Sequence, residues 1–291
     1  MSCKNKINLE KKHTEKSIIK CKQFNLSRLP SKISIATIAS SCKLDAYIDL
    51  DNVNRYLKLS KDDIITVKYN KEIRSLDEKV LKKRKKKNPK RFLNQVTIEV
   101  MVPNGTNKTK KLNMKLFCNG SIQMSGSKNI LQCDCALRKL LNKLIKPVTI
   151  DDTIKYFVFN EIEDGKIIHC KDLNVKTFKI NMINTSFSVN YLINRDKLYE
   201  LLLDNDVNCK YETVNHAAVI IYHTLKENSN RIVTALVFES GKIIITGAKN
   251  KEEIIETFDY VSSTLIENRK RIMKTDITLL SKDVLMDLLK D

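Results

Sequence analysis

The sequence predicts an α+β fold of two similar units, each an antiparallel sheet with helices on one side. Two observations carry this prediction: an internal repeat, and the order in which strand and helix patterns follow one another. Residues 116–129 align with residues 237–250 without a gap, so that Phe, two Gly, Ile, Lys and Asn recur in place. Antiparallel strands with helices on one face are typical of the α+β class.

Each unit reads as strand, helix, three strands and a long helix. The first unit is expected to hold a strand near 33–44, a helix at 49–57, a strand at 92–102, two strands joined at Gly120, and a helix at 129–144. The second is expected to hold a strand at 178–189, a helix at 194–203, a strand at 216–225, two strands joined at Gly241, and a helix at 250–266. Apolar residues recur at helical spacing in both long helices and predict a face packed on a sheet.

Three internal segments, 60–87, 103–111 and 147–176, have no counterpart in the other unit. Strand composition at 64–69, and at 154–159 before an Asp164-Gly165 turn, predicts a hairpin in the first and in the last of these segments.

The composition indicates a nucleic-acid partner. The chain has 291 residues, 53 Lys and Arg against 34 Asp and Glu, and a formal net charge of +19, so it should be drawn to a polyanion. No apolar run approaches the roughly 18 residues of a membrane span, and the first 29 residues resemble no signal peptide, so an intracellular protein is expected. The motifs of hydrolases, phosphate-binding loops and zinc proteases are missing from the sequence, and no enzyme is predicted.

The eight cysteines predict reduced thiols rather than a metal site. None forms a CxxC pair, and Cys133-Asp-Cys135 lies in a predicted helix without a second ligand pair. No cofactor is expected.

The second copy resembles the TATA-box-binding protein family. The resemblance rests on Ala235-Leu-Val-Phe-Glu-Ser-Gly-Lys-Ile-Ile-Ile-Thr-Gly-Ala-Lys249, followed by Glu252-Glu-Ile254. Further segments follow in family order: Cys42-Lys-Leu-Asp45, Asn88-Pro-Lys-Arg-Phe92, Phe178-Lys-Ile180 and Tyr211-Glu212. The insertions and the Lys, Asn and Ile bias suggest a divergent member from a large DNA virus.

The resemblance implies a pseudo-twofold saddle: a curved antiparallel sheet with its concave face on the DNA minor groove and helices on the convex face. The expected organisation is a basic tail at 1–31, a first repeat at 32–147 with an insertion at 60–87, a linker at 148–176, and a second repeat at 177–291 ending in a helical extension.

The resemblance also implies a set of DNA-contacting residues. The family's four Phe wedges, two per repeat, are matched by Phe92, Phe117 and Phe238, with His216 at the fourth position. Ser125 and Thr246 take base-facing positions, and Leu236 and Ile244 take apolar concave positions that hold Lys115 and Gln123 in the first copy. Residues expected at phosphates are Arg91, Lys128, Lys242 and Lys249, with Asn119 and Ser240 as neutral donors.

The family's central Asn is missing from both repeats. Met182 takes its place in the second copy, with Asn181 and Asn184 expected to point elsewhere, and either Ile33 or Thr37 takes its place in the first. Losing these donors should leave a weakened preference for A/T-rich DNA, carried mostly by the second copy.

The function expected from the resemblance is basal transcription initiation: binding and bending promoter DNA and recruiting factors similar to transcription factors IIA and IIB, in the nucleus, a viral factory or the virion. Glu212 matches the segment that contacts factor IIB, although Val214 and Asn215 depart from it. The alternative is a saddle-fold protein-interaction scaffold that binds nucleic acid only nonspecifically. The basic run 82–87, with Lys90 and Arg91, could clamp DNA, direct nuclear import or solvate the insertion. Homodimerisation of the free protein stays open.

Overall fold

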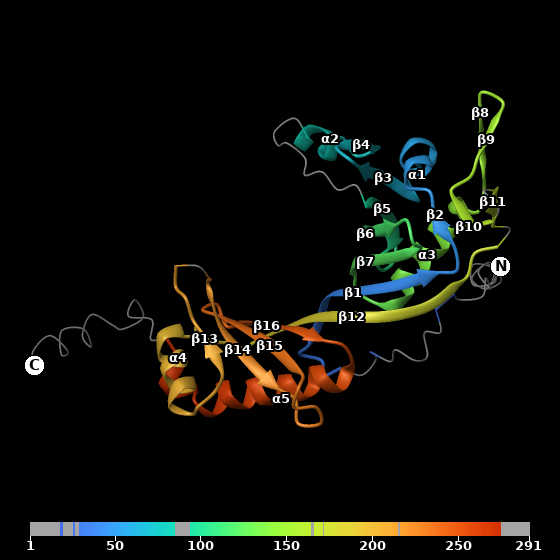
Figure 1. Ribbon diagram of the computed structural model, residues 1–291. Helices are drawn as coiled ribbons and strands as arrows, with labels where there is room; N and C mark the ends of the chain where they lie inside the picture. Colours follow the sequence, from blue (N-terminus) through green and yellow to red (C-terminus); the bar gives the residue numbers. More distant parts are fainter. Residues whose placement is uncertain are drawn as a thin grey trace, which may run out of the picture. The chain divides into compact units, whose positions relative to one another are not determined.

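The computed structural model describes residues 18–19, 26, 29–84, 94–163, 166–170, 172–214 and 216–274. The chain forms two compact units: unit 1 comprises Met1–Asn25 and Thr37–Asn181, and unit 2 comprises Leu26–Ala36 and Met182–Asp291. Each unit combines antiparallel strands with helices, which confirms the predicted α+β class (Figure 1). Strands β1 (Ser34–Leu44) and β12 (Val175–Ser188) each contribute residues to both units.

Unit 1 contains a sheet in the order β1, β7, β6, β5, β3, β4. Its strands after β1 are β3 (Ile64–Tyr69), β4 (Glu72–Ser75), β5 (Gln95–Pro103), β6 (Thr109–Phe117) and β7 (Ser121–Ser127). Its helices are α1 (Leu50–Tyr56), α2 (Glu78–Arg84) and α3 (Ile130–Leu144). Helix α3 packs on β5 and β7, and α1 packs on β3 and β5. Strand residues alternate between buried and partly exposed, so one sheet face forms the core with these helices.

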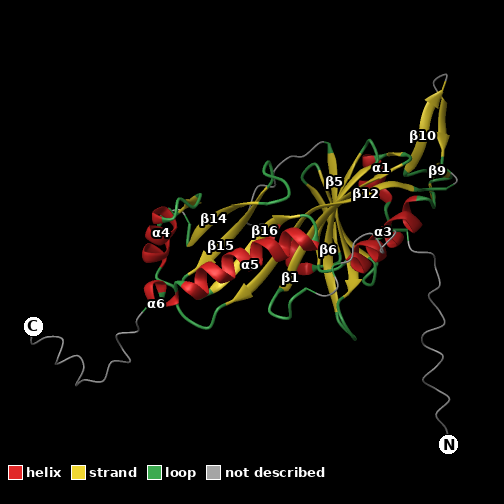
Figure 2. Ribbon diagram, turned by 90° about the horizontal axis from the view of Figure 1, so that it is seen from below, coloured by secondary structure: helices red, strands yellow, loops and turns green. Residues whose placement is uncertain are grey.

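Unit 2 contains β12 and four further strands in the order β13, β14, β15, β16, β12. These are β13 (Cys209–Lys210), β14 (Ala218–Thr224), β15 (Ile232–Phe238) and β16 (Lys242–Ala248). Its helices are α4 (Arg195–Asp204), α5 (Lys251–Glu267) and α6 (Arg269–Ile272). The long helix α5 lies along β15 and β16, and α4 packs on β13 and β14 (Figure 2).

The two units repeat the same strand irregularity. In unit 1 a bulge separates the pairs Ile38–Ser127 and Ser40–Met124, and in unit 2 a bulge separates Ile183–Ala248 and Thr185–Ile245. Ser127 aligns with Ala248 in the internal repeat, so the duplication extends to the strand register. Gly126 and Gly247 precede these residues at φ values of 97° and 95°, a conformation that favours glycine.

The insertion after α1 joins the sheet of unit 1. The expected hairpin is present as β3 and β4, and β3 pairs with β5 from Lys68–Thr97 to Ile64–Val100. Helix α2, which the sequence pattern did not predict, follows β4. The insertion therefore extends the unit 1 sheet by two strands.

The 147–176 segment forms two small sheets. Strands β8 (Val148–Ile150) and β9 (Thr153–Lys155) make a hairpin, and β10 (Val158–Glu163) pairs with β11 (Lys166–His169) and with β2 (Tyr47–Ile48). The expected continuous strand at 154–159 is wrong, because Phe157 is buried and its carbonyl accepts from the Asp49 N–H at 2.9 Å. Phe157 therefore lies between two separate strands, β9 and β10, and belongs to neither.

Some expectations fall outside the described residues. These are most of the basic tail, the end of the charged run from residue 85, and the C-terminal extension beyond Lys274. No helix among the described residues has the length and apolar character needed to cross a bilayer. In the same residues no group of His, Cys, Asp and Glu is arranged to hold a metal ion.

Candidate nucleic-acid interface

The sheet face opposite the helices is partly exposed in each unit and is called the open face below. In unit 2 the core side of the strands is formed by buried Val219, Ile221, Val233, Ala235, Val237, Ile243 and Ile245. The alternate residues form the open face: Met182, Asn184, Ile220, Tyr222, Thr234, Leu236, Phe238, Ile244 and Thr246. Four residues predicted to contact DNA therefore lie on one surface.

Leu236 and Ile244 are direct cross-strand neighbours on this face, and Ile220 pairs with Leu236 from the other side. Their side chains are only partly covered although they are apolar. A row of partly exposed aliphatic side chains across a sheet is typical of a surface that binds a partner.

His216 and Phe238 lie together at the end of β15, where Ala218 pairs with Phe238. Their ring centroids are 6.5 Å apart with an interplanar angle of 38°. The Ala218 N–H donates to His216 Nδ1 at 3.3 Å, so in the neutral ring Nε2 carries the proton. The structure thus brings together the two rings that the sequence assigned to the second pair of wedges.

Arg195 joins the two segments that carry these rings. Its guanidinium donates to the Ala217 carbonyl and to the Glu239 carboxylate, both at 2.9 Å. Glu239 also accepts from Lys274 at 2.6 Å, and this hydrogen bond lowers the pKa of Glu239. Sequence reasoning missed Arg195, because its partners are distant in the chain.

The structure corrects the expected direction of the Asn184 side chain. Met182 lies on the open face as predicted, but Asn184 shares this face, since Ile183 and Thr185 between and beyond them are buried. The Thr246 hydroxyl donates to Asn184 Oδ1 at 2.7 Å and lies 3.3 Å from Met182 Sδ. Asn181, in unit 1, instead accepts from the Ser41 hydroxyl at 3.0 Å.

The open face of unit 1 is more polar. Thr97, Lys115 and Gln123 lie side by side where unit 2 has Ile220, Leu236 and Ile244. Ser125 is exposed beside Asn113, and Phe117 ends β6 opposite Gln95. Phe92, the expected partner of Phe117, lies outside the described residues, as does Arg91.

The matching bulges of β1 and β12 identify the unit 1 residue that corresponds to Met182. Ile38 and Ile183 hold the same place in the two registers, so Thr37 matches Met182 and Ala39 matches Asn184. Thr37 Oγ1 accepts from the Gly126 N–H at 3.1 Å. Ile33, the other candidate, is buried.

A charged network occupies the unit 1 open face near the insertion. Glu99 accepts from Lys68 at 2.6 Å and from Thr66 at 3.1 Å, and Lys111 lies 3.8 Å from the same carboxylate while it pairs with Asp77. Sequence reasoning missed this network, because it forms only when β3 pairs with β5.

The other predicted phosphate contacts lie at strand ends and turns. Lys128, Lys242 and Lys249 are exposed, as are Asn119 and Ser240 in the two hairpin turns. Exposed cations such as Lys128, Lys242 and Lys249, at the margins of a sheet, suit phosphate contacts. Burial and the nearby charge of Lys128 lower the pKa of Lys110.

The segment that includes Glu212 turns sharply before His216, whose N–H donates to the Glu212 carbonyl at 2.8 Å. The Glu212 carboxylate pairs with Lys210 at 2.7 Å, which raises the pKa of Lys210. Val214 at the tip is 95% exposed.

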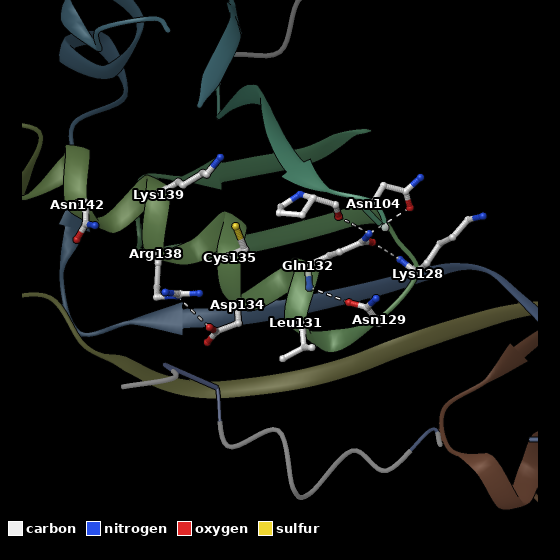
Figure 3. A pocket seen from close by; sticks show the side chains of 12 residues that line it. Asn104, Lys128, Asn129, Leu131, Gln132, Asp134, Cys135, Arg138, Lys139 and Asn142 are labelled. Atoms are coloured by element: carbon white, nitrogen blue, oxygen red, sulfur yellow. Dashed lines mark hydrogen bonds and ion pairs between the residues drawn. The ribbon is translucent and has the colours of Figure 1, made fainter. Parts of the chain in front are cut away.

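A cavity of about 780 Å³ lies on the helix side of unit 1, between the 103–105 loop and α3 (Figure 3). Gln132 closes one wall, since its side chain donates to the Pro103 carbonyl at 2.8 Å and accepts from the Lys128 N–H at 2.7 Å. Of the predicted DNA contacts that the structure describes, Lys128 alone lines this cavity.

The fold and the open faces define a class of two-unit α+β proteins that carry partly exposed aromatic and aliphatic side chains on a sheet. Residues 177–267 match the family profile described as transcription factor TFIID, or TATA-binding protein (TBP). The chain is 34% identical over 273 residues to a TATA-box-binding protein-like protein of Acanthamoeba polyphaga mimivirus, covering 89% of this chain and 71% of that relative. The chain belongs to the TATA-box-binding protein family, a family of non-enzymatic transcription factors.

The membership predicted from the sequence is confirmed, and this relative is a viral protein. Among solved structures, the TBP of Methanococcus jannaschii is 17% identical, with a TM-score of 0.49, over 81% of this chain and 99% of that one.

Proposed function

We propose that the chain binds A/T-rich promoter DNA in the minor groove through its open faces, bends it, and presents a surface that recruits transcription machinery. The observation that carries this proposal is the open face of unit 2, where Phe238 and His216 lie next to partly exposed Leu236 and Ile244. TATA-box-binding proteins are themselves the type example of apolar wedges that kink DNA at the minor groove.

The aromatic pair would act as the wedge. A ring inserted between two base pairs replaces part of their stacking, and the duplex kinks away from the protein. Aliphatic side chains beside the ring suit sugars and base edges, because these surfaces lose water on contact. Lys242 and Lys249 at the margins would contact phosphates, which adds affinity without reading sequence.

Recruitment would use surfaces outside the open faces. We assign the segment around Glu212 to a protein partner similar to transcription factor IIB, since it presents an exposed Val214 beside the Lys210–Glu212 pair. A factor IIA-like partner is also proposed from the family. The protein would act where its template is transcribed, in the nucleus or a viral factory.

The alternative is a scaffold that binds nucleic acid only through charge. The polar open face of unit 1, with Glu99, Lys115 and Gln123, favours it. The two functions differ in one assay: binding of the full chain to a TATA-containing duplex and to a scrambled duplex of equal length at physiological salt. A clear preference for the TATA duplex supports the initiation factor, and equal binding supports the scaffold.

A further inference from the structure

Asn184 places an amide on the open face of unit 2, on β12, the last strand in the order of the unit 2 sheet. It lies on β12 two residues after Met182, and the buried residues Ile183 and Thr185 occupy the opposite face. The bulge between Ile183 and Thr185 sets this register against β16. Asn184 therefore belongs to the surface that also carries Leu236 and Ile244.

The hydrogen bond from Thr246 fixes which end of the amide is free. The Thr246 hydroxyl donates to Asn184 Oδ1 at 2.7 Å, so the carbonyl end is engaged. Among the described residues none accepts a hydrogen bond from Nδ2. The amide thus offers two N–H donors from an otherwise largely apolar surface.

We infer that Asn184 is a specificity-determining residue, which donates to minor-groove acceptors and disfavours guanine in the half-site bound by unit 2. This inference rests on the proposed function. Adenine N3 and thymine O2 accept hydrogen bonds in the minor groove, while the guanine amino group adds a competing donor at the same place. A donor that loses water against apolar neighbours discriminates strongly, since leaving it unpaired is unfavourable.

Unit 1 lacks this donor. Ala39 holds the matching place in β1, and the nearby Thr37 hydroxyl oxygen already accepts from the Gly126 N–H. An amide at this place is therefore found in unit 2 alone among the described strands, since the amides of the unit 1 open face, Asn113 and Gln123, lie on β6 and β7. Because the two open faces present their donors at different places, an asymmetric site would be bound in one preferred orientation.

The test measures competition binding of the full chain to a duplex with a central A/T run, and to a set in which each pair is changed in turn to G·C. Three variants are compared with the wild type. Asn184→Leu keeps the size and removes both donors, Thr246→Val removes the group that orients the amide, and Asn230→Leu makes the same chemical change in an exposed loop of unit 2. Thermal unfolding of each variant reports whether it is folded.

We expect Asn184→Leu to lower discrimination against G·C by about tenfold at one or two adjacent pairs and to leave the other pairs unchanged. Thr246→Val should lower discrimination less at the same pairs, and Asn230→Leu should match the wild type. If Asn184→Leu keeps the wild-type discrimination at every pair, the inference is wrong while the proposed function stands. If the wild type binds A/T and scrambled duplexes equally, the proposed function itself is wrong.

Discussion

The His216 and Phe238 ring centroids lie 6.5 Å apart at one end of the unit 2 open face. A backbone hydrogen bond to the imidazole, and hydrogen bonds from Arg195 to Ala217 and Glu239, hold the two segments that carry the rings. An imidazole can stack, but it covers less of a base than a phenyl ring and keeps a polar edge. This pair should therefore insert between base pairs less effectively than two phenyl rings would.

His216→Phe should strengthen binding to an A/T-rich duplex. The added apolar area and a second phenyl ring contribute about 0.5–1.5 kcal/mol, which is several-fold in affinity. Fluorescence anisotropy against labelled duplex measures the change. Weaker binding by a folded His216→Phe variant would show that the imidazole makes a polar contact that the phenyl ring cannot replace.

The basic run after α2 should contribute to salt-dependent binding. Replacing Lys85, Lys86 and Lys87 by Ala should reduce the slope of log affinity against log salt by about 0.9 for each phosphate that these side chains neutralise. Lys270→Ala, on the short helix α6, serves as the control and should leave the slope unchanged. An unaltered slope in the triple variant rejects the clamp and leaves nuclear import or solvation as its role.

Arg231 and Glu253 make a bidentate ion pair, with Nε–Oε1 at 3.1 Å and Nη2–Oε2 at 2.9 Å, which joins the start of β15 to the first turn of α5. Burial alone would raise the pKa of Glu253, but hydrogen bonds from Arg231 and from the Lys249 N–H outweigh it and lower that pKa below its usual range. The pair should therefore stabilise the fold above the unfolded pKa of Glu253, and this contribution should disappear as the pH falls through the folded pKa.

Glu253→Gln should accordingly lower the unfolding free energy at neutral pH by about 1–2 kcal/mol. Urea unfolding at neutral and acidic pH measures this loss, which should shrink at acidic pH. A loss of equal size at both values would show that the carboxylate charge contributes nothing.

Asp134 joins Ile19 to α3. Its side chain is 4% exposed and accepts from the Ile19 N–H at 2.9 Å and from Arg138 Nε at 3.0 Å. Asp134→Ala removes these acceptors near the buried Ile19 and should lower the unfolding free energy by about 1–3 kcal/mol. Asp134→Asn keeps an acceptor oxygen and should lose less. Equal losses in urea unfolding would contradict a hydrogen-bonding role.

Local patterns in the sequence predicted most elements but not their long-range pairing. The family resemblance named Leu236, Phe238, Ile244 and Thr246 as DNA contacts, and the alternation along β15 and β16 in the structure places them on one face. The pairing of β3 with β5 could not be predicted, because no local pattern specifies which strand an insertion joins. The charged network around Glu99 depends on this pairing and was missed with it.

The direction of Asn184 shows a second limit of prediction from the sequence. The gapless alignment of 178–183 located Met182, but the expected direction of Asn184 was wrong. Alternation along β12 places Asn184 on the same face as Met182. Its contact with Thr246 depends on the register with β16 across the Ile183–Thr185 bulge, which no local pattern specifies. Phe157 is similar, since a strand pattern at 154–159 gives no sign that its carbonyl binds the Asp49 N–H.

DNA bending by Phe238→Ala tests the central claim most directly. The bend angle is measured by energy transfer between dyes at the two ends of a TATA-containing duplex, at protein concentrations that saturate the wild type and the variant. The wild type should bend the duplex, and the variant should give a smaller angle as well as weaker binding, because base stacking returns where the ring is removed. An unbent duplex with the wild type, or an unchanged angle with the variant, would contradict the assignment of Phe238 as a wedge.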